Sequence, residues 1–326
     1  MSSNLLNEST FNAKMAEKEA MLQAIAQALS SSSSSPYIYM SVSDYLSITP
    51  ESGKLYWVIG NNGKHGVYRN GEFLEGDTVV SPWLIMQGRV RAGTAASYYT
   101  VGDTVTVKKN DADTTWVIAA LDKATPADST KTHSLTLIPQ NCIESLMFDN
   151  KEPNNPNSDR KNYGNNRYAH SAIRQWLNSS ANAGSWWTSQ HTYDATPDYA
   201  TTKDGFMKGF DPYFLDVIGK TSIIVAKNTV TDGGGSETLS DEYFYLMSKQ
   251  EVGLGAENNI AEGQQFPIFT DANSRKRTYN GSSTYWWLRS PSSSSSNDAR
   301  GVGTDGSGGN SYAYSARGIL PACNII

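Results

Sequence analysis

The sequence predicts an α+β fold in which strands come first, helices follow, and strands return at the end. Aromatic residues make up 11% of the 326 residues and charged residues only 18%, which is typical of a compact protein with much irregular backbone. Runs rich in β-branched and aromatic residues occur before residue 140 and again after residue 220, and the helix signals lie between them. This order predicts that the two ends of the main domain meet in one sheet.

Residues 1–35 are predicted to form a helix and a flexible boundary, as an attachment or oligomerisation segment. The composition from Glu8 to Leu29 favours a helix with a narrow apolar seam at near-heptad spacing. The seam consists of Met15, Leu22, Ile25 and Leu29. Because it lasts under about four heptads, self-association and packing against the protein itself or a scaffold both remain open. Six serines followed by Pro36 mark the boundary.

Residues 36–97 are predicted to form a small antiparallel β domain that connects the other two parts. Lys54–Ile59 and Val67–Arg69 have the composition of strands. The Asn-Gly pairs at 62–63 and 70–71 favour two-residue hairpin turns, because Asn and Gly tolerate positive φ angles. We interpret the segment as a meander of short strands.

The strands of the main domain, residues 98–326, are predicted from short apolar runs. They fall into an early group and a late group. The early strands are expected at 101–107, 115–121 and 134–138, and the late strands at 222–230, 243–247, 285–288 and 318–325. Ser248 and Glu251 form a capping-box pattern for a short helical turn after the second late strand.

Two helices are predicted between these groups of strands. The first has one apolar face, made of Ala169, Ile173, Trp176 and Leu177. The second begins with Asp211 as its cap and Pro212 at its first position, and it ends at Gly219. Its core-facing residues are expected to be Phe214, Leu215 and Ile218. Between the two helices lies a long polar excursion that contains the pair Trp186-Trp187.

Charge and hydropathy argue against two classes of partner. The formal net charge is −5, and no cluster of Lys and Arg provides a footprint for a nucleic-acid backbone. No apolar run approaches the roughly 20 residues that are needed to cross a bilayer. The N-terminus lacks the charged stretch and apolar stretch of a Sec-type signal peptide. We therefore expect no nucleic-acid partner and no membrane insertion.

Motifs for cofactor or metal chemistry are weak. Cys142 and Cys323 match no zinc or disulfide framework, and we interpret them as core thiols, with a single disulfide as the alternative. Gly301, Gly303 and Gly306 spell GxGxxG, but no helix is predicted to follow, as dinucleotide binding requires. Glu152-Pro153-Asn154 is interpreted as a turn rather than a calcium-dependent sugar motif. We predict no cofactor and no metal.

The segment between Trp286–Pro291 and Arg317–Ala322 consists almost entirely of Ser, Gly, Asn, Asp, Ala and Tyr. Because both flanks are apolar and must be buried, we predict an anchored, exposed loop system. Tyrosine offers a wide contact area at little rotamer cost, and Ser, Gly and Asn offer adaptable hydrogen bonds. Tyr312 and Tyr314 are the best anchor candidates. A surface loop without a ligand is the alternative interpretation.

Six motifs of the main domain occur together. They are Tyr163–Arg167, Ile173–Asn178, Trp186-Trp187, Trp286–Pro291, Ala299-Arg300 and Gly318–Cys323. Together they resemble the C-type-lectin-like (formylglycine-generating-enzyme-like) ligand-binding domains of phage receptor-binding proteins, and especially the variable proteins of diversity-generating retroelements. The resemblance spans roughly residues 98–326, does not cover the first third of the chain, and implies a variable region at about 286–326.

In such proteins a reverse-transcriptase system rewrites adenines in selected codons, so that Asn, Ser and Tyr codons vary. The resemblance implies ligand contact at Ser292, Ser293, Ser294, Ser295, Ser296, Asn297, Asp305, Ser307, Asn310, Ser311, Tyr312 and Tyr314. It implies a scaffold role for Trp286, Trp287, Arg300 and Pro321. Leu320 stands where such endings often carry Arg, a departure that bears on diversification and not on the fold.

We therefore expect a non-enzymatic receptor- or ligand-binding protein, either at a phage tail tip or as an adhesin on a bacterial surface. Its partner would be a protein or glycan receptor on a bacterial or host cell, gripped by a homo-oligomer such as a trimer. One alternative is a structural virion or surface protein without a variable ligand site. Another is an oxidative enzyme of the formylglycine-generating type, which would need a reactive Cys323.

Overall fold

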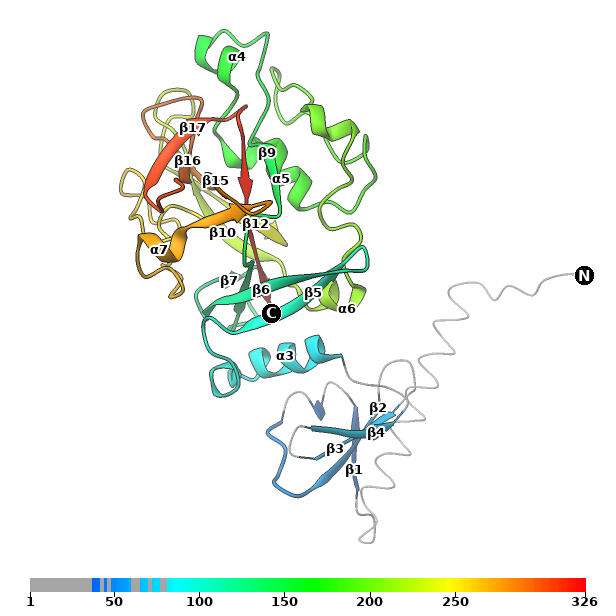
Figure 1. Cartoon of the computed structure of the whole chain (residues 1–326). Coiled ribbons are helices and arrows are strands. Elements are labelled where there is room, and N and C mark those ends of the chain that lie inside the picture. The colour runs from blue at the N-terminus through cyan, green and yellow to red at the C-terminus, as the bar shows by residue number, and fades with distance from the viewer. Residues whose placement is uncertain (1–36, 42–43, 46–47, 60–64, 70–71, 77–80) are drawn as a thin grey trace, which may run out of the picture. The chain divides into compact units, whose positions relative to one another are not determined.

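The computed structural model describes residues 37–41, 44–45, 48–59, 65–69, 72–76 and 81–326. These residues form a mixed α+β structure, mostly strands in several antiparallel sheets with a few short helices (Figure 1). The chain divides into two compact units, residues 1–92 and 93–326. The helix expected at 8–29, the serine boundary and both Asn-Gly turns lie outside the described residues.

The first unit holds a four-stranded sheet with strand order β1-β2-β3-β4. The strands are β1 (Tyr37–Ser41), β2 (Leu55–Ile59), β3 (His65–Arg69) and β4 (Glu72–Gly76). The last three form the antiparallel meander that was predicted. The first strand corrects that prediction, because β1 pairs parallel with β2. Hydrophobic alternation does not specify the direction in which two strands pair.

Helix α3 (Pro82–Arg91) of the first unit was not predicted, although its start carries local signals. The Ser81 side chain accepts a hydrogen bond from the backbone N–H of Trp83, and Pro82 occupies the first helical position. Two residues of this helix pack on the core of the unit. That core cluster consists of Tyr45, Tyr56, Val58 and Tyr68, with Leu84 and Ile85 from the helix beside it.

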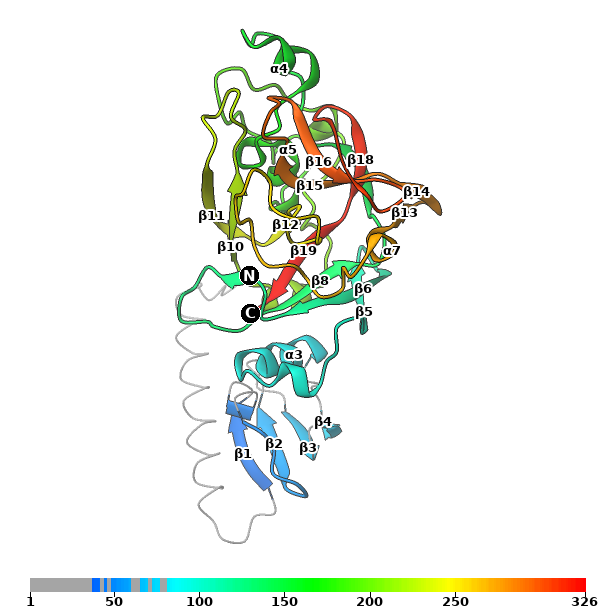
Figure 2. The same cartoon turned by 90° about the vertical axis from the view of Figure 1, so that its left-hand side faces the viewer.

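One five-stranded sheet of the second unit has the order β12-β19-β8-β6-β5. Its strands are β5 (Thr104–Lys109), β6 (Ala112–Leu121), β8 (Leu135–Pro139), β12 (Phe244–Leu246) and β19 (Pro321–Ile325). All of its pairings are antiparallel. Early and late strands of the unit therefore share one sheet, as predicted, and Figure 2 shows β19 beside β8.

The other five-stranded sheet has the order β17-β16-β15-β18-β9, so β17 lies at its edge. Its strands are β9 (Glu144–Met147), β15 (Trp286–Pro291), β16 (Asp298–Val302), β17 (Gly308–Tyr312) and β18 (Ala316–Ile319). The single late strand expected at 318–325 is wrong, because the chain passes from β18 in this sheet to β19 in the other. Pro321, which lacks an N–H, begins the second of these strands.

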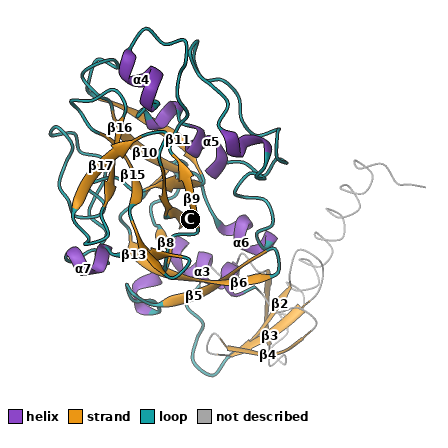
Figure 3. Ribbon diagram, turned by 45° about the horizontal axis from the view of Figure 1, so that its top comes forward, coloured by secondary structure: helices purple, strands orange, loops and turns teal. Residues whose placement is uncertain are grey.

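The remaining elements are short and are separated by long loops, as Figure 3 shows. The small sheets contain β7 (Thr125–Pro126), β10 (Thr221–Ala226), β11 (Ser236–Glu242), β13 (Arg277–Tyr279) and β14 (Ser282–Thr284). The helices are α4 (Ser158–Tyr163), α5 (Ala172–Leu177), α6 (Pro212–Val217) and α7 (Ala272–Arg275), with 3-10 turns at Ala95–Ser97, Tyr168–His170 and Asp198–Thr201. No helix in the described part of the chain has the length and apolar content to cross a membrane.

The predicted caps form the expected hydrogen bonds, whereas the helices are shorter than predicted. The apolar face of the first helix is buried, but a 3-10 turn at Tyr168–His170 carries its first residue. The Asp211 side chain accepts from the N–H of Tyr213 at 3.1 Å and caps α6. Ser248 and Glu251 exchange both capping-box hydrogen bonds, at 2.9 and 3.0 Å.

Strand β15 anchors the polar segment from inside the second unit. Trp286 and Trp287 are fully buried, and the indole N–H of Trp287 donates to the carbonyl of Leu146 at 3.0 Å. Arg289 is also fully buried, and its Nη1 pairs with an oxygen of Glu251 at 2.6 Å. The opposite flank, Gly318–Ala322, is buried too. Both ends of the segment are therefore held by packed strands, as expected.

Candidate functional site

Three tyrosines from separate segments lie together on the surface of the second unit. Tyr163 ends α4, Tyr312 ends β17, and Tyr314 follows in the turn before β18. The ring centroids of Tyr163 and Tyr312 are 4.2 Å apart, with an angle of 21° between the ring planes. Those of Tyr312 and Tyr314 are 6.4 Å apart, with an angle of 14°. Those of Tyr163 and Tyr314 are 6.3 Å apart, with an angle of 33°. We call these three rings the tyrosine face.

The tyrosine face has exposed groups that a ligand could contact. The Tyr312 side chain is 44% exposed. Lys151 Nζ lies 4.3 Å from the ring centroid of Tyr314, so a cation sits beside the aromatic surface. Within the described part of the chain, no protein group forms a hydrogen bond with any of the three hydroxyl groups. The face can therefore offer ring area, hydroxyl groups and one positive charge to a ligand.

The buried residue Ala313 orients two of the tyrosines. Its N–H donates to the carbonyl of Asn297 at 2.9 Å, and its own carbonyl accepts from the N–H of Phe148 at 2.8 Å. Ala313 and Tyr314 are the central residues of a turn that the N–H of Ser315 closes by donating to the carbonyl of Tyr312 at 2.9 Å. This turn leaves Ala313 inside the protein, Tyr312 exposed and Tyr314 half-buried.

Gly164 allows α4 to come close to the loop that carries Tyr314. Its φ angle is +85°, a backbone conformation that residues with side chains rarely adopt. A Cβ atom at this position would lie 2.9 Å from the carbonyl oxygen of Asp149 and 3.1 Å from the backbone nitrogen of Tyr314. That nitrogen donates to the carbonyl of Tyr163 at 3.1 Å. Glycine is therefore required for the two segments to hold the rings in contact.

The serine run, residues 292–297, is held against the protein. The side-chain amide of Asn166 donates to the carbonyl oxygens of Ser295 at 2.8 Å and Asp298 at 2.9 Å. Asn166 is fully buried, so these bonds are shielded from water. Most of the interactions that fix the run involve its backbone and not its hydroxyl groups, as a tightly built turn requires.

Burial of the serine run corrects part of the predicted ligand set. Ser292, Ser296 and Asn297 are buried, with exposed fractions of 5%, 0% and 5%. The Ser296 hydroxyl donates to the side chain of Asn157 at 3.0 Å, so it serves the fold. The expectation of ligand contact does not fit these three residues, because other parts of the protein cover them. Ser294 is exposed, and Ser293 and Ser295 are half-buried.

The other predicted contact residues lie on β17 and in the turn before it. Asp305 and Ser307 are exposed, and hydrogen bonds from the hydroxyl and N–H of Ser307 lower the pKa of the Asp305 carboxyl. Asn310 is exposed and donates to the Asp298 carboxylate at 2.7 Å, while Ser311 is half-buried. These side chains form a polar surface that continues from the tyrosine face along the edge strand.

Of the predicted scaffold residues, Trp286, Trp287 and Pro321 are buried. Arg300 is half-buried, and its Nη2 pairs with Glu257 at 2.8 Å. Burial of Glu257 opposes its charged form. Hydrogen bonds from Arg300 and from the N–H of Ser293 outweigh this and lower the pKa of the Glu257 carboxyl to about 2. Arg300 thereby joins the sheet to the serine run.

Sequence reasoning missed two members of this surface. Tyr163 belongs to one of the six family motifs but was not predicted to contact a ligand, and no role was predicted for Lys151. Both reach Tyr312 and Tyr314 through tertiary contacts between segments more than one hundred residues apart in the sequence. The glycine after Tyr163 was the one local signal, because a glycine directly after a helix often marks a close backbone approach.

The cysteines and the acidic motif occupy structural positions. Cys142 and Cys323 are buried and free, which confirms core thiols and excludes the disulfide alternative in this structure. Burial raises the pKa of the Cys142 thiol to about 12, and that of Cys323 well above its usual range. Glu152 precedes a turn, as expected, and its buried carboxylate accepts from Asn165 at 2.9 Å and contacts His191 at 3.1 Å. Among the described residues, no group of three or more His, Cys, Asp or Glu side chains could hold a metal ion.

Comparison with other proteins places the chain in a family. No curated protein and no solved structure matches it. A family model does match residues 134–326, which include every strand from β8 onward and all of the tyrosine face. This is more than half of the chain. The chain therefore belongs to the family described as a domain of unknown function, DUF6273.

Proposed function

We propose that this chain is a non-enzymatic receptor-binding protein that grips its target with the tyrosine face, either at a phage tail tip or on a bacterial surface. The observation that carries the proposal is the contact of three tyrosine rings whose hydroxyl groups have no partner among the described residues. Exposed aromatic clusters on a rigid support are typical of interaction sites. The backbone hydrogen bonds of Ala313 and the close backbone approach at Gly164 supply that support.

The finer fold assignment in this proposal is a C-type-lectin-like domain. Three features support it: strands from the start and end of the unit pair in one sheet, the short helices of the unit lie between them in sequence, and much of the unit is loop. The buried strand β15, with its tryptophan pair, holds the polar segment at one end. The variable proteins that the sequence resembles display their ligand-contacting residues on such a scaffold.

The proposed contact surface differs from the set that the sequence predicted. It includes Tyr163 and Lys151 in addition to Tyr312 and Tyr314, and it leaves out the buried members of the serine run. Asn310 lies two residues before Tyr312 on β17, so both point to the same side of the sheet. An aromatic centre with a polar surround is the usual arrangement of a binding hot spot.

Multivalent display would strengthen such a site. The trimer that we expect through the first 35 residues would present three tyrosine faces, and each further contact would form at a high effective concentration. A protein or glycan receptor on a bacterial or host cell remains the proposed partner. Of the alternatives, the oxidative enzyme would need an accessible thiol at Cys323. The complete burial of this side chain therefore favours the binding protein.

The proposal is tested with the full chain, fluorescently labelled and applied to a printed glycan array and to a panel of intact bacterial cells. For targets that bind the natural sequence, Tyr312→Ala combined with Tyr314→Ala is expected to reduce binding by about tenfold or more. Tyr213→Ala is the matched control, because Tyr213 is 56% exposed in the same unit but lies in α6. Equal binding by the double variant and the control would contradict the proposal.

A further inference from the structure

A pocket in the second unit is separate from the tyrosine face. It has a volume of about 610 Å³ and is lined by β5, β6, residues 139–144 and three aromatic side chains from later segments. It shares no residue with the tyrosine face. In Figures 1 and 2, β5 and β6 lie at the opposite end of this unit from α4. Pockets of this size suit small molecules.

Aromatic rings form one wall of the pocket. The ring centroids of Phe206 and Phe210 are 5.1 Å apart, with an angle of 83° between the ring planes. The ring centroids of Phe206 and Trp176 are also 5.1 Å apart. Trp116 contacts Phe210 at 6.2 Å and lines the pocket from β6. Such a wall favours a flat apolar group, because aromatic rings prefer stacked or edge-to-face contacts.

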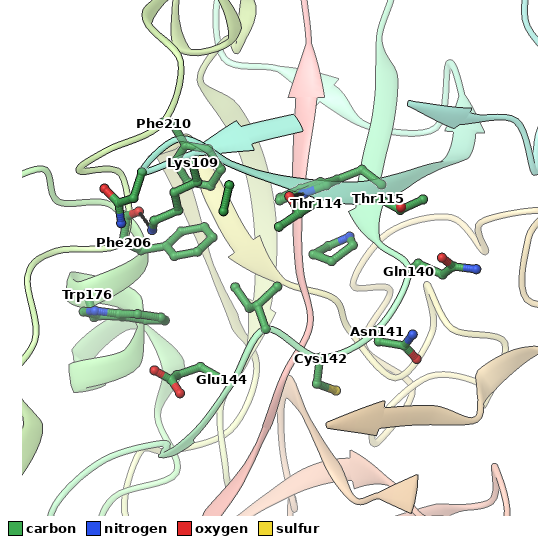
Figure 4. Close-up of a pocket in the computed structure, with 15 residues that line it drawn as sticks. Lys109, Thr114, Thr115, Gln140, Asn141, Cys142, Glu144, Trp176, Phe206 and Phe210 are labelled. Carbon is green, nitrogen blue, oxygen red and sulfur yellow. Dashed lines mark hydrogen bonds between the residues drawn. The ribbon is translucent and has the colours of Figure 1, made fainter. Parts of the chain in front are cut away.

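Lys109 supplies a cation at the aromatic end of the pocket, as Figure 4 shows. Its Nζ lies 4.2 Å from the ring centroid of Phe206 and 4.6 Å from that of Phe210, and it donates a hydrogen bond to the Phe206 carbonyl. No carboxylate that the structure describes lies within ion-pair distance of its Nζ. An ammonium group has three donors. Lys109 therefore retains hydrogen-bonding capacity and an unneutralised charge.

The surroundings of Lys109 disfavour its charge. Burial lowers the pKa of Lys109 to about 8, and the more distant carboxylates of Glu144 and Asp204 offset this only in part. Glu144, the carboxylate among the lining residues, is already bonded to Lys203 and accepts from the Tyr279 hydroxyl at 2.8 Å. An anion that enters the same low-dielectric space would strongly stabilise the charge of this half-buried ammonium, because the ammonium has no acidic partner of its own.

We propose that this pocket binds a small amphipathic carboxylic acid, with its carboxylate at Lys109 Nζ and its flat apolar body against Phe206, Phe210 and Trp176. The carboxylate accepts hydrogen bonds from the unused donors and neutralises the cation. The rings bury the apolar body, while Gln140 and Asn141 leave the far end of the pocket polar. A single cation fits a monoanionic carboxylate better than a phosphate group, which typically recruits several donors.

The matched probes are indole-3-acetate and its neutral amide, titrated calorimetrically into the full chain. The acid is expected to bind at least about tenfold more tightly than the amide, because a hydrogen bond to a charged group commonly contributes that much. Lys109→Met is expected to remove this preference and leave amide binding unchanged. Lys109→Arg keeps the charge and is expected to retain the preference. Lys108→Met removes an exposed lysine that does not line the pocket. It is the control and is expected to bind both probes as the natural sequence does.

Three results would overturn the proposal. The first is equal binding of acid and amide by the natural sequence. The second is the absence of acid binding at about 10 mM, a concentration at which even weak specific sites fill. The third is unchanged acid binding by Lys109→Met when its circular dichroism matches that of the natural chain. If Lys109→Met does not fold, the acid–amide pair and Lys109→Arg still decide the matter, since neither depends on that variant.

Discussion

Replacement of Arg289 by methionine is predicted to lower the free energy of unfolding of the second unit by about 3–5 kcal/mol, the usual cost of breaking a buried ion pair from one side. The guanidinium is fully buried and donates to the two oxygens of Glu251 at 2.6 and 2.9 Å. It also donates to the carbonyls of Leu246 at 3.0 Å and Ile224 at 3.2 Å. Methionine fills similar space but leaves the Glu251 carboxylate buried without a countercharge.

The measurement is guanidinium chloride unfolding of the full chain, followed by tryptophan fluorescence, because Trp286 and Trp287 lie on the same strand. The control is Lys208→Met, which breaks the exposed pair with Asp204 and is expected to change stability by less than about 1 kcal/mol. Adding Glu251→Gln to Arg289→Met is expected to recover about 1–3 kcal/mol, because it removes the stranded charge. A loss from Arg289→Met no larger than the control's would refute this account of the core.

Four further results are expected. Asn166→Ala should cost about 2–4 kcal/mol in urea unfolding and make the serine run the first site of limited proteolysis, because the loop loses its buried donors. Lys109 has a pKa of about 8 in the folded protein against an ordinary 10.5, so the unfolded chain binds more protons between these values. Stability should therefore rise with pH from 8 to 10.5, and less so in Lys109→Met. Tyr312→Ala should lower the free energy of unfolding by less than about 1.5 kcal/mol, because Tyr312 is exposed, and Trp287→Ala should lower it by at least about 3 kcal/mol, because Trp287 is buried. Thermal unfolding measures both changes. Cys323 should react with a thiol reagent only at the rate of unfolding, and fast labelling of the native protein would contradict its burial.

Features of the fold that depend on neighbouring residues were predictable from sequence. The Asp211 cap and the Ser248–Glu251 box each need only side chains within three positions of one another, and both hydrogen-bond as expected. The apolar flanks of the polar segment were predictable for a similar reason, since an aromatic strand must be buried wherever it lies. Helix α3 also begins with a local signal, because Ser81 caps it and Pro82 occupies its first position.

Features that depend on distant partners were not predictable in this way. The donors that hold the serine run come from Asn166, which is 129 residues before Ser295, and from Arg160 and Thr229. Composition alone cannot distinguish a serine that faces a ligand from one that faces its own protein, since both require a small polar residue. The same limit applies to the passage from β18 to β19, because the two strands form one apolar run that pairs with different sheets.

The burial of the polar segment also restricts where sequence variation can act. Asn166 binds backbone carbonyls in the serine run, so exchanges among small residues there would keep its bonds. A large side chain at Ser296 would instead displace the contact with Asn157 inside the protein, at the cost of overpacking. Tyr312 and Asn310 on the edge strand meet no such limit, because both are exposed. A binding surface that varies without loss of the fold is therefore expected to vary along β17 and to keep the serine run small.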